Sequence, residues 1–251
     1  MTRLDTLVAR VTKKYLTRKP LLRSVRHSEL SILTWADDDV RPNELLFGLS
    51  TRAIQDALET GLDDLQIRNK DLPDSVYYNL LPGEHYRLLH VLAREVAKRN
   101  IVEIGTFTGM SAACMLQGMP TGCKLTTFDV LPWRQFRSHL DEDDFAKGKI
   151  EQVLEDLSNP ITFAKHQGLF ENAELIFCDA PKDGVFEPRF LANLTAVKPT
   201  STCLLVLDDT RLLNMIDVWR AIRSPKLDLT SFGHWSGTGL VDMTDGLKFE
   251  M

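Results

Sequence analysis

The chain has 251 residues, enough for one large α/β domain with a substantial core, or for such a domain with a small helical extension. Its apolar content of 43% and charged content of 26% are those of an ordinary globular protein, and a net charge of −5 argues against nucleic acid or a membrane as partner. The N-terminus lacks the apolar core of a signal peptide, and no apolar run is long enough to span a membrane. We therefore expect a cytoplasmic protein.

The first part of the chain, residues 1–80, is predicted to form a helical extension in front of the main domain, residues 81–251. Basic side chains dominate residues 1–30, and apolar residues at helical spacing predict an amphipathic helix that ends near Pro20. We expect this helix to pack against the body of the protein or a second subunit, which is compatible with a homodimer. A membrane surface or an anionic partner is the alternative.

A second helix is expected over residues 43–58, with Asn43 as its N-cap and Gly61 beyond its end. The polar run 63–74 contains a proline and predicts a loop. The four cysteines show no C-x-x-C spacing, so we expect buried free thiols in place of disulfides or zinc ligands.

From residue 83 onward, strands alternate with helices, which predicts a parallel sheet with helices on both faces. A short turn joins the last two strands and predicts that the final strand is antiparallel. The expected strands are 101–104, 124–128, 150–154, 175–178, 203–207, 227–232 and 239–243, and the expected helices are 84–99, 111–118, 162–167, 188–197 and 212–222.

The run IVEIGTFTGMS, residues 101–111, is predicted to be a buried strand, a turn with the spacing G-x-x-x-G, and the start of a helix. Gly105 can adopt dihedral angles closed to other residues, and Gly109 has no Cβ to block a ligand or a facing strand. Free N–H groups at the start of the helix can hold an anionic group such as a carboxylate. Ordinary packing of small residues is the alternative interpretation.

With Glu103 inside the strand, this run resembles motif I of the class I S-adenosylmethionine (SAM) dependent methyltransferases, and most closely the catechol and caffeoyl-CoA O-methyltransferase branch. The resemblance implies a Rossmann-like class I methyltransferase fold, with a seven-stranded, mostly parallel sheet, and SAM as methyl donor. It also implies that Glu103 and Ser111 hold the methionine end of SAM. The residues of the turn that would line the cofactor site are Gly105, Thr106, Phe107 and Gly109.

Further acidic residues follow the predicted strands, and ligands of open parallel sheets bind at the carboxyl ends of strands. Asp129 ends the second strand roughly 20 residues after the glycine turn, the spacing of an acid that accepts hydrogen bonds from ribose hydroxyls. Asp156 follows the third strand, where the family often has a polar contact to the adenine. Acids that only cap turns are the alternative.

Three more acids follow two strands predicted to be neighbours. Asp179 follows the fourth strand, and Asp208 and Asp209 follow the fifth. Adjacent strands lie about 4.8 Å apart, so these carboxylates would repel one another unless a cation neutralises them. Oxygen ligands suit Mg²⁺, with Ca²⁺ or Mn²⁺ as substitutes. Simply solvated acids are the alternative.

This arrangement resembles that of the metal-dependent O-methyltransferases, which carry Asp-x-x-Lys after the fourth strand and Asp-Asn after the fifth. The resemblance implies that Asp179, Asp208 and Asp209 hold the metal, that Asp179 also borders the cofactor site, and that Lys182 is the catalytic base, its pKa lowered by the cation. Asp209 replaces the usual Asn.

The loop 233–239 joins the last two strands at the same edge of the sheet, so His234 and Trp235 are candidates for substrate contact, and His234 for an auxiliary base. The expected substrate is a small molecule with a hydroxyl group, of catechol or phenol, sugar or polyketide type. Three alternatives remain: a metal-independent methyltransferase, a non-catalytic partner subunit of the same fold, and a nicotinamide-dependent oxidoreductase, although the full G-x-G-x-x-G fingerprint is missing.

Overall fold

The computed structural model describes residues 40–79, 85–230, 232 and 236–251. The amphipathic helix predicted within residues 1–30, and the residues His234 and Trp235, lie outside this part of the chain. Within it, none of the helices combines the length and the apolar character needed to cross a membrane.

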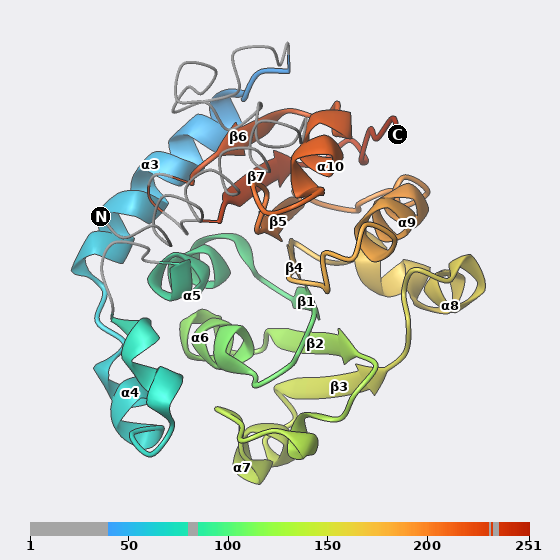
Figure 1. Ribbon diagram of the computed structural model, residues 1–251. Coiled ribbons are helices and arrows are strands. Elements are labelled where there is room, and N and C mark those ends of the chain that lie inside the picture. The colour runs from blue at the N-terminus through green and yellow to red at the C-terminus, as the bar shows by residue number, and fades with distance from the viewer. Residues whose placement is uncertain (1–39, 80–84, 231, 233–235) are drawn as a thin grey trace, which may run out of the picture.

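In the described part of the chain, seven strands form one sheet in the order β3-β2-β1-β4-β5-β7-β6 (Figure 1). Neighbouring strands from β3 to β5 are parallel, while β7 is antiparallel to both β5 and β6. This confirms the Rossmann-like class I methyltransferase fold and the antiparallel last strand. The strands are β1 (Asn100–Ile104), β2 (Lys124–Asp129), β3 (Ile150–Leu154), β4 (Leu175–Cys178), β5 (Leu204–Asp208), β6 (Lys226–Asp228) and β7 (Thr238–Asp242).

Successive residues of the buried strands point to opposite faces of the sheet, and they are mostly apolar on both faces. Helices therefore cover both faces, with one hydrophobic core on each side. Ile101 belongs to the core shared with α3, α5 and α6, whereas Val102 faces the core under α8, α9 and α10. The helices are α3 (Glu44–Glu59), α4 (Asp63–Arg68), α5 (His85–Val96), α6 (Met110–Gly118), α7 (Glu142–Ala146), α8 (Pro160–Glu171), α9 (Phe186–Leu194) and α10 (Met215–Ala221), with 3-10 turns η2 (Pro73–Tyr78) and η3 (Trp133–Gln135).

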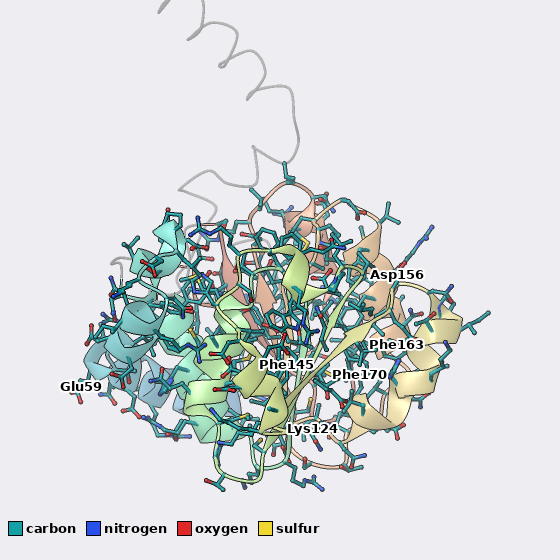
Figure 2. The ribbon with its side chains drawn as sticks, turned by 90° about the horizontal axis from the view of Figure 1, so that it is seen from below. Glu59, Lys124, Phe145, Asp156, Phe163 and Phe170 are labelled. Carbon is teal, nitrogen blue, oxygen red and sulfur yellow. The ribbon has the colours of Figure 1, made fainter. Side chains whose placement is uncertain are left out.

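Aromatic side chains fill much of the second core. Phe163 and Phe170, labelled in Figure 2, stack with ring centroids 4.8 Å apart. Phe170 also contacts Phe128 of β2. Such large apolar side chains remove much surface from water and fix α8 against the sheet. The four cysteines are free and buried, as predicted.

Helix α3 begins as predicted, since the Asn43 side chain accepts a hydrogen bond from the N–H of Leu46 at 3.1 Å. The same side chain donates to Asp242 of β7 at 2.7 Å. Buried α3 residues belong to the core that also contains α5. The domain boundary near residue 80 stays a prediction.

The loop predicted over residues 63–74 is wrong, because this segment forms α4 and the start of η2. Helix α4 buries Leu65, and its Arg68 pairs with Asp144 of α7 at 3.2 Å. A single short turn with one buried apolar residue carries too little periodicity to be recognised in the sequence.

Candidate active site

Strand β1 leads into the glycine turn at the carboxyl edge of the sheet. Gly105 has φ +97°, and a Cβ there would lie 1.9 Å from the carbonyl oxygen of Asp179. Gly109 has φ +76° and precedes α6, where a Cβ would lie 2.5 Å from the Leu140 side chain. Both positions require glycine, and the protein's own close packing is sufficient reason at each.

The acid inside β1 is completely buried. The Ser111 hydroxyl donates to Glu103 Oε1 at 2.5 Å, and Glu103 Oε2 has no hydrogen-bond partner among the described residues. Burial raises the pKa of Glu103 from 4.5 to about 8, against the lowering effect of the hydrogen bond from Ser111. The structure thus brings Glu103 and Ser111 together behind the glycine turn, where neither lines the cavity described below.

Asp129, at the end of β2, holds the glycine turn. Its Oδ2 accepts hydrogen bonds from the N–H groups of Thr106 at 3.0 Å and Phe107 at 2.9 Å, and its Oδ1 accepts from Leu131 N–H at 3.0 Å. The Thr106 hydroxyl is bonded to that of Thr127 at 2.7 Å. Phe107 itself has φ 42°, an uncommon value for a residue with a side chain.

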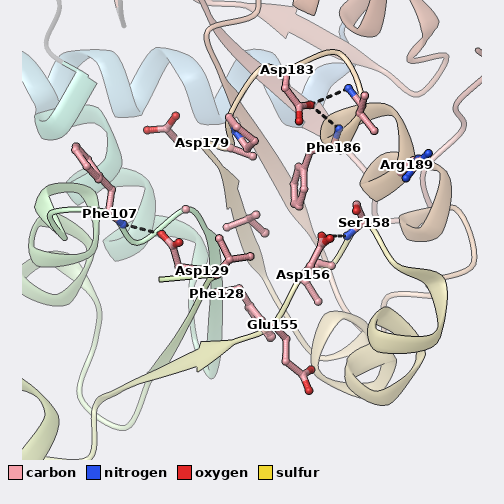
Figure 3. Close-up of a pocket in the computed structure, with 17 residues that line it drawn as sticks. Phe107, Phe128, Asp129, Glu155, Asp156, Ser158, Asp179, Asp183, Phe186 and Arg189 are labelled. Atoms are coloured by element: carbon pink, nitrogen blue, oxygen red, sulfur yellow. Dashed lines mark hydrogen bonds between the residues drawn. The ribbon is translucent and has the colours of Figure 1, made fainter. Parts of the chain in front are cut away.

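A cavity of about 610 Å³ opens beside this turn, over the ends of β1 to β4 (Figure 3). Five of the predicted cofactor residues line it: Gly105, Phe107, Asp129, Asp156 and Asp179. The carboxylate of Asp156 accepts a hydrogen bond from Ser158 N–H at 2.9 Å. Thr106, Gly109, Glu103 and Ser111 do not line it.

The β4–α9 loop and α9 form a wall of the cavity that was not predicted from the sequence. Asp183, Phe186 and Arg189 line the cavity there, and Asp183 accepts hydrogen bonds from the N–H groups of Val185 and Phe186, both at 2.8 Å. An Asp-Gly pair just before a predicted helix is a recognisable capping signal, which could have pointed to this wall.

The three acids predicted as metal ligands do come together. Each of Asp179, Asp208 and Asp209 offers an oxygen, and these atoms lie within 4.8 Å of one another. The pairing of Cys178 with Leu207 in the parallel β4–β5 ladder causes this, since it places the following residues opposite each other. Three carboxylate oxygens are a donor set that suits a hard divalent cation.

Lys182 lies beside Asp179, Asp208 and Asp209, and these four residues form what we call the acid–lysine cluster. Its Nζ forms ion pairs with the carboxylates of Asp179 and Asp209, the latter at 3.0 Å, and its side chain is buried. Burial lowers the pKa of Lys182, but Asp179, Asp208 and Asp209 raise it further, so that the net shift is upward. The predicted downward shift depended on a bound cation, and the protein's own charges produce the opposite.

Lys182 and Asp209, like Phe107, have backbone angles that residues with a side chain rarely adopt: φ is 52° at Lys182 and 58° at Asp209. Such conformations cost free energy and persist where the surroundings impose them, which is frequent at functional sites. His85, the first residue of α5, is buried with Nδ1 3.8 Å from Asp208 Oδ1, and the sequence analysis did not single it out.

The family model described as O-methyltransferase matches residues 79–211, more than half of the chain. The chain belongs to the O-methyltransferase family. The glycine turn, Asp129, the cavity walls and the acid–lysine cluster of this O-methyltransferase family member all lie within the matched region.

A putative O-methyltransferase from Mycolicibacterium smegmatis is 32% identical in an alignment of 118 residues that covers 42% of this chain and 49% of that protein. The chain thus spans about half the length of this curated relative. Among solved structures, a methyltransferase from Geobacter sulfurreducens has a TM-score of 0.50 and 15% identity, over 80% of this chain and 96% of that one. TomG from Streptomyces achromogenes, solved in complex with SAM, has a TM-score of 0.45 and 19% identity, over 80% and 90% of the two chains.

Proposed function

We propose that this chain is a SAM-dependent O-methyltransferase that acts on a hydroxyl group of a small molecule. The observation that carries the proposal is the position of Asp179, which both lines the cavity and belongs to the acid–lysine cluster. A methyl donor in the cavity would therefore lie next to groups able to bind and deprotonate a hydroxyl. Membership of the family supports the same chemistry.

The cavity has the character of a SAM site. Its volume of about 610 Å³ is within the usual range for sites of small molecules. A carboxylate offers about four lone-pair positions, so Asp129 can accept from ribose hydroxyls in addition to the backbone of the glycine turn. SAM supplies the methyl group on a sulfonium centre, and the protein's part is to hold it in line with the acceptor oxygen.

The acid cluster fits a divalent cation such as Mg²⁺, because its donors are all carboxylate oxygens from two adjacent strand ends. Asp179, Asp208 and Asp209 would hold the ion. A bound divalent cation makes a nearby hydroxyl easier to deprotonate. The acids raise the pKa of Lys182, and a bound cation would offset their charge, so that Lys182 would lose its own proton and then accept that of the hydroxyl. Its ion pairs with Asp179 and Asp209 hold its Nζ at this edge of the sheet.

One observation favours a second candidate, a metal-independent methyltransferase. The ammonium of Lys182 already contacts two of the three carboxylates, so it can balance part of their charge. In that case Lys182 would orient the acceptor hydroxyl as a hydrogen-bond donor.

The test is calorimetric titration with SAM and with NAD, followed by transfer of labelled methyl groups to a panel of catechols, sugars and polyketides. We expect SAM to bind, NAD not to bind, and transfer to at least one hydroxyl. Loss of transfer with a chelator, and its return with Mg²⁺, would support the metal-dependent form; unchanged transfer would favour the second candidate. Failure to bind SAM would exclude both.

A further inference from the structure

The backbone of Lys182 is held in its unusual conformation by side chains from two helices. Its N–H donates to Glu187 Oε1 of α9 at 2.7 Å, and Glu187 is completely buried. Since water does not reach this carboxylate, no solvent molecule can replace it as the acceptor. Burial raises the pKa of Glu187.

Asn214, which precedes α10, contacts the backbone carbonyl of the same residue. When its amide group is oriented to satisfy both neighbours, its nitrogen donates to the Lys182 carbonyl at 3.1 Å and its oxygen accepts from Gly184 N–H at 3.3 Å. The neighbours fix this orientation, because a carbonyl only accepts and an N–H only donates. Gly184 has φ +82°, and a Cβ on it would lie 3.3 Å from the Asn214 side chain.

The N–H and the C=O of Lys182 are thus bonded to side chains from two different parts of the chain, Glu187 in α9 and Asn214 before α10. This matters because a left-handed conformation is unfavourable for lysine and needs external support. The same backbone directs the buried side chain so that Nζ contacts Asp179 and Asp209. Neither Glu187 nor Asn214 lines the cavity, so neither is placed to touch a ligand bound there.

We propose that Glu187 and Asn214 are positioning residues, which hold Lys182 in the left-handed conformation and thereby hold its ammonium group against Asp179 and Asp209. Their bearing on catalysis rests on the proposed function; their hold on the backbone does not. These contacts fix the position of Lys182 independently of the glycine turn and of the three acids.

The effect of Glu187 and Asn214 on the Lys182 backbone can be measured without a substrate. The measurement is the hydrogen-exchange rate of individual backbone amides, followed by NMR in the full chain. Glu187→Met removes the acceptor at similar volume, and Asn214→Asp keeps an acceptor for Gly184 but removes the donor to Lys182. We expect both variants to accelerate exchange at the Lys182 amide at least about tenfold. Glu187→Gln keeps an acceptor oxygen and should stay within about threefold of wild type.

Asn172→Asp is the matched control for Asn214→Asp. Asn172 also donates to a backbone carbonyl, that of Gly168 at 2.7 Å, but at the end of α8. The Asn172→Asp variant should leave hydrogen exchange at the Lys182 amide unchanged. If Glu187→Met does not fold, Asn214→Asp decides alone, and unchanged exchange in the folded variants would refute the hold.

The consequence for chemistry is measured as methyl transfer from SAM to a catechol in the presence of Mg²⁺. Glu187→Met and Asn214→Asp should lower kcat by about tenfold to a hundredfold, with the Kd for SAM unchanged and with Glu187→Gln close to wild type. Faster exchange with an unchanged kcat would refute the positioning role. If the wild type transfers no methyl group to any diol, the proposed function fails, while amide exchange still decides whether Glu187 and Asn214 hold Lys182.

Discussion

Replacing Glu103 by glutamine should make the stability of this protein less dependent on pH. Glu103 is fully buried in β1, and its pKa is raised from 4.5 to about 8 in the folded protein. Between these two values the folded protein keeps a proton that the unfolded chain has released. The wild type must therefore lose stability as the pH rises through this interval.

The magnitude follows from the shift itself. Each pH unit between the two pKa values lowers the free energy of unfolding by about 1.4 kcal/mol, so the loss between about pH 5.5 and about pH 7.5 is about 3 kcal/mol. Glutamine cannot ionise and can still accept the hydrogen bond from Ser111. The variant should lack this part of the pH dependence while all other titrating groups contribute as before.

Urea unfolding gives the free energy of unfolding of wild type and Glu103→Gln at both pH values. The change with pH in one protein is then subtracted from that in the other, which cancels the contribution of all other titrating groups. Glu151→Gln on β3 is the control, because the Glu151 side chain is exposed and pairs with Lys124 at the surface at 2.6 Å. Parallel stability profiles for wild type and Glu103→Gln would show that Glu103 is ionised in the folded protein and would refute the reasoning.

Gly105→Ala should lower the free energy of unfolding in urea by about 3 kcal/mol or more, because the new Cβ would meet the Asp179 carbonyl. Gly148 also has a positive φ, but no atom lies within 4 Å of a Cβ there, so Gly148→Ala should lower it by about 1 kcal/mol. Equal losses would show that conformation alone matters. Asp208→Asn removes one charge from the acid cluster and should weaken Mg²⁺ binding at least about tenfold in calorimetry, without changing the Kd for SAM. Unchanged Mg²⁺ affinity would place the ion elsewhere. Asn43→Ala removes the cap of α3 and should lower the free energy of unfolding by about 1 kcal/mol; no loss would mean that water replaces the cap.

Much of the fold could be predicted because buried parallel strands carry continuous apolar runs that end abruptly. Strand β4 begins and ends at the predicted residues, and β1 and β2 differ from prediction by one residue at one end. The prediction for residues 63–74 was wrong because α4 buries only one apolar side chain and is stabilised by packing that its sequence does not reveal. Strand β6 ends earlier than predicted, at Asp228, whose carboxylate accepts hydrogen bonds from the N–H and the hydroxyl of Thr230.

The proximity of Asp179, Asp208 and Asp209 was predictable because strand adjacency brings strand ends together. The contacts of Glu187 and Asn214 with Lys182 were not, since they depend on the path of the β4–α9 loop and on where α10 begins. Loop paths follow from tertiary packing and not from periodicity. The roles predicted for the individual site residues stay predictions until ligands are bound.

The place of β7 has a consequence for how the protein is made. Among the described strands, β7 comes last in the sequence, yet it lies between β5 and β6 and supplies hydrogen bonds to both. Until residues 238–242 leave the ribosome, one edge of β5 remains an open template for other strands. Nascent chains and C-terminally truncated products should therefore depend on chaperones more than the finished protein does.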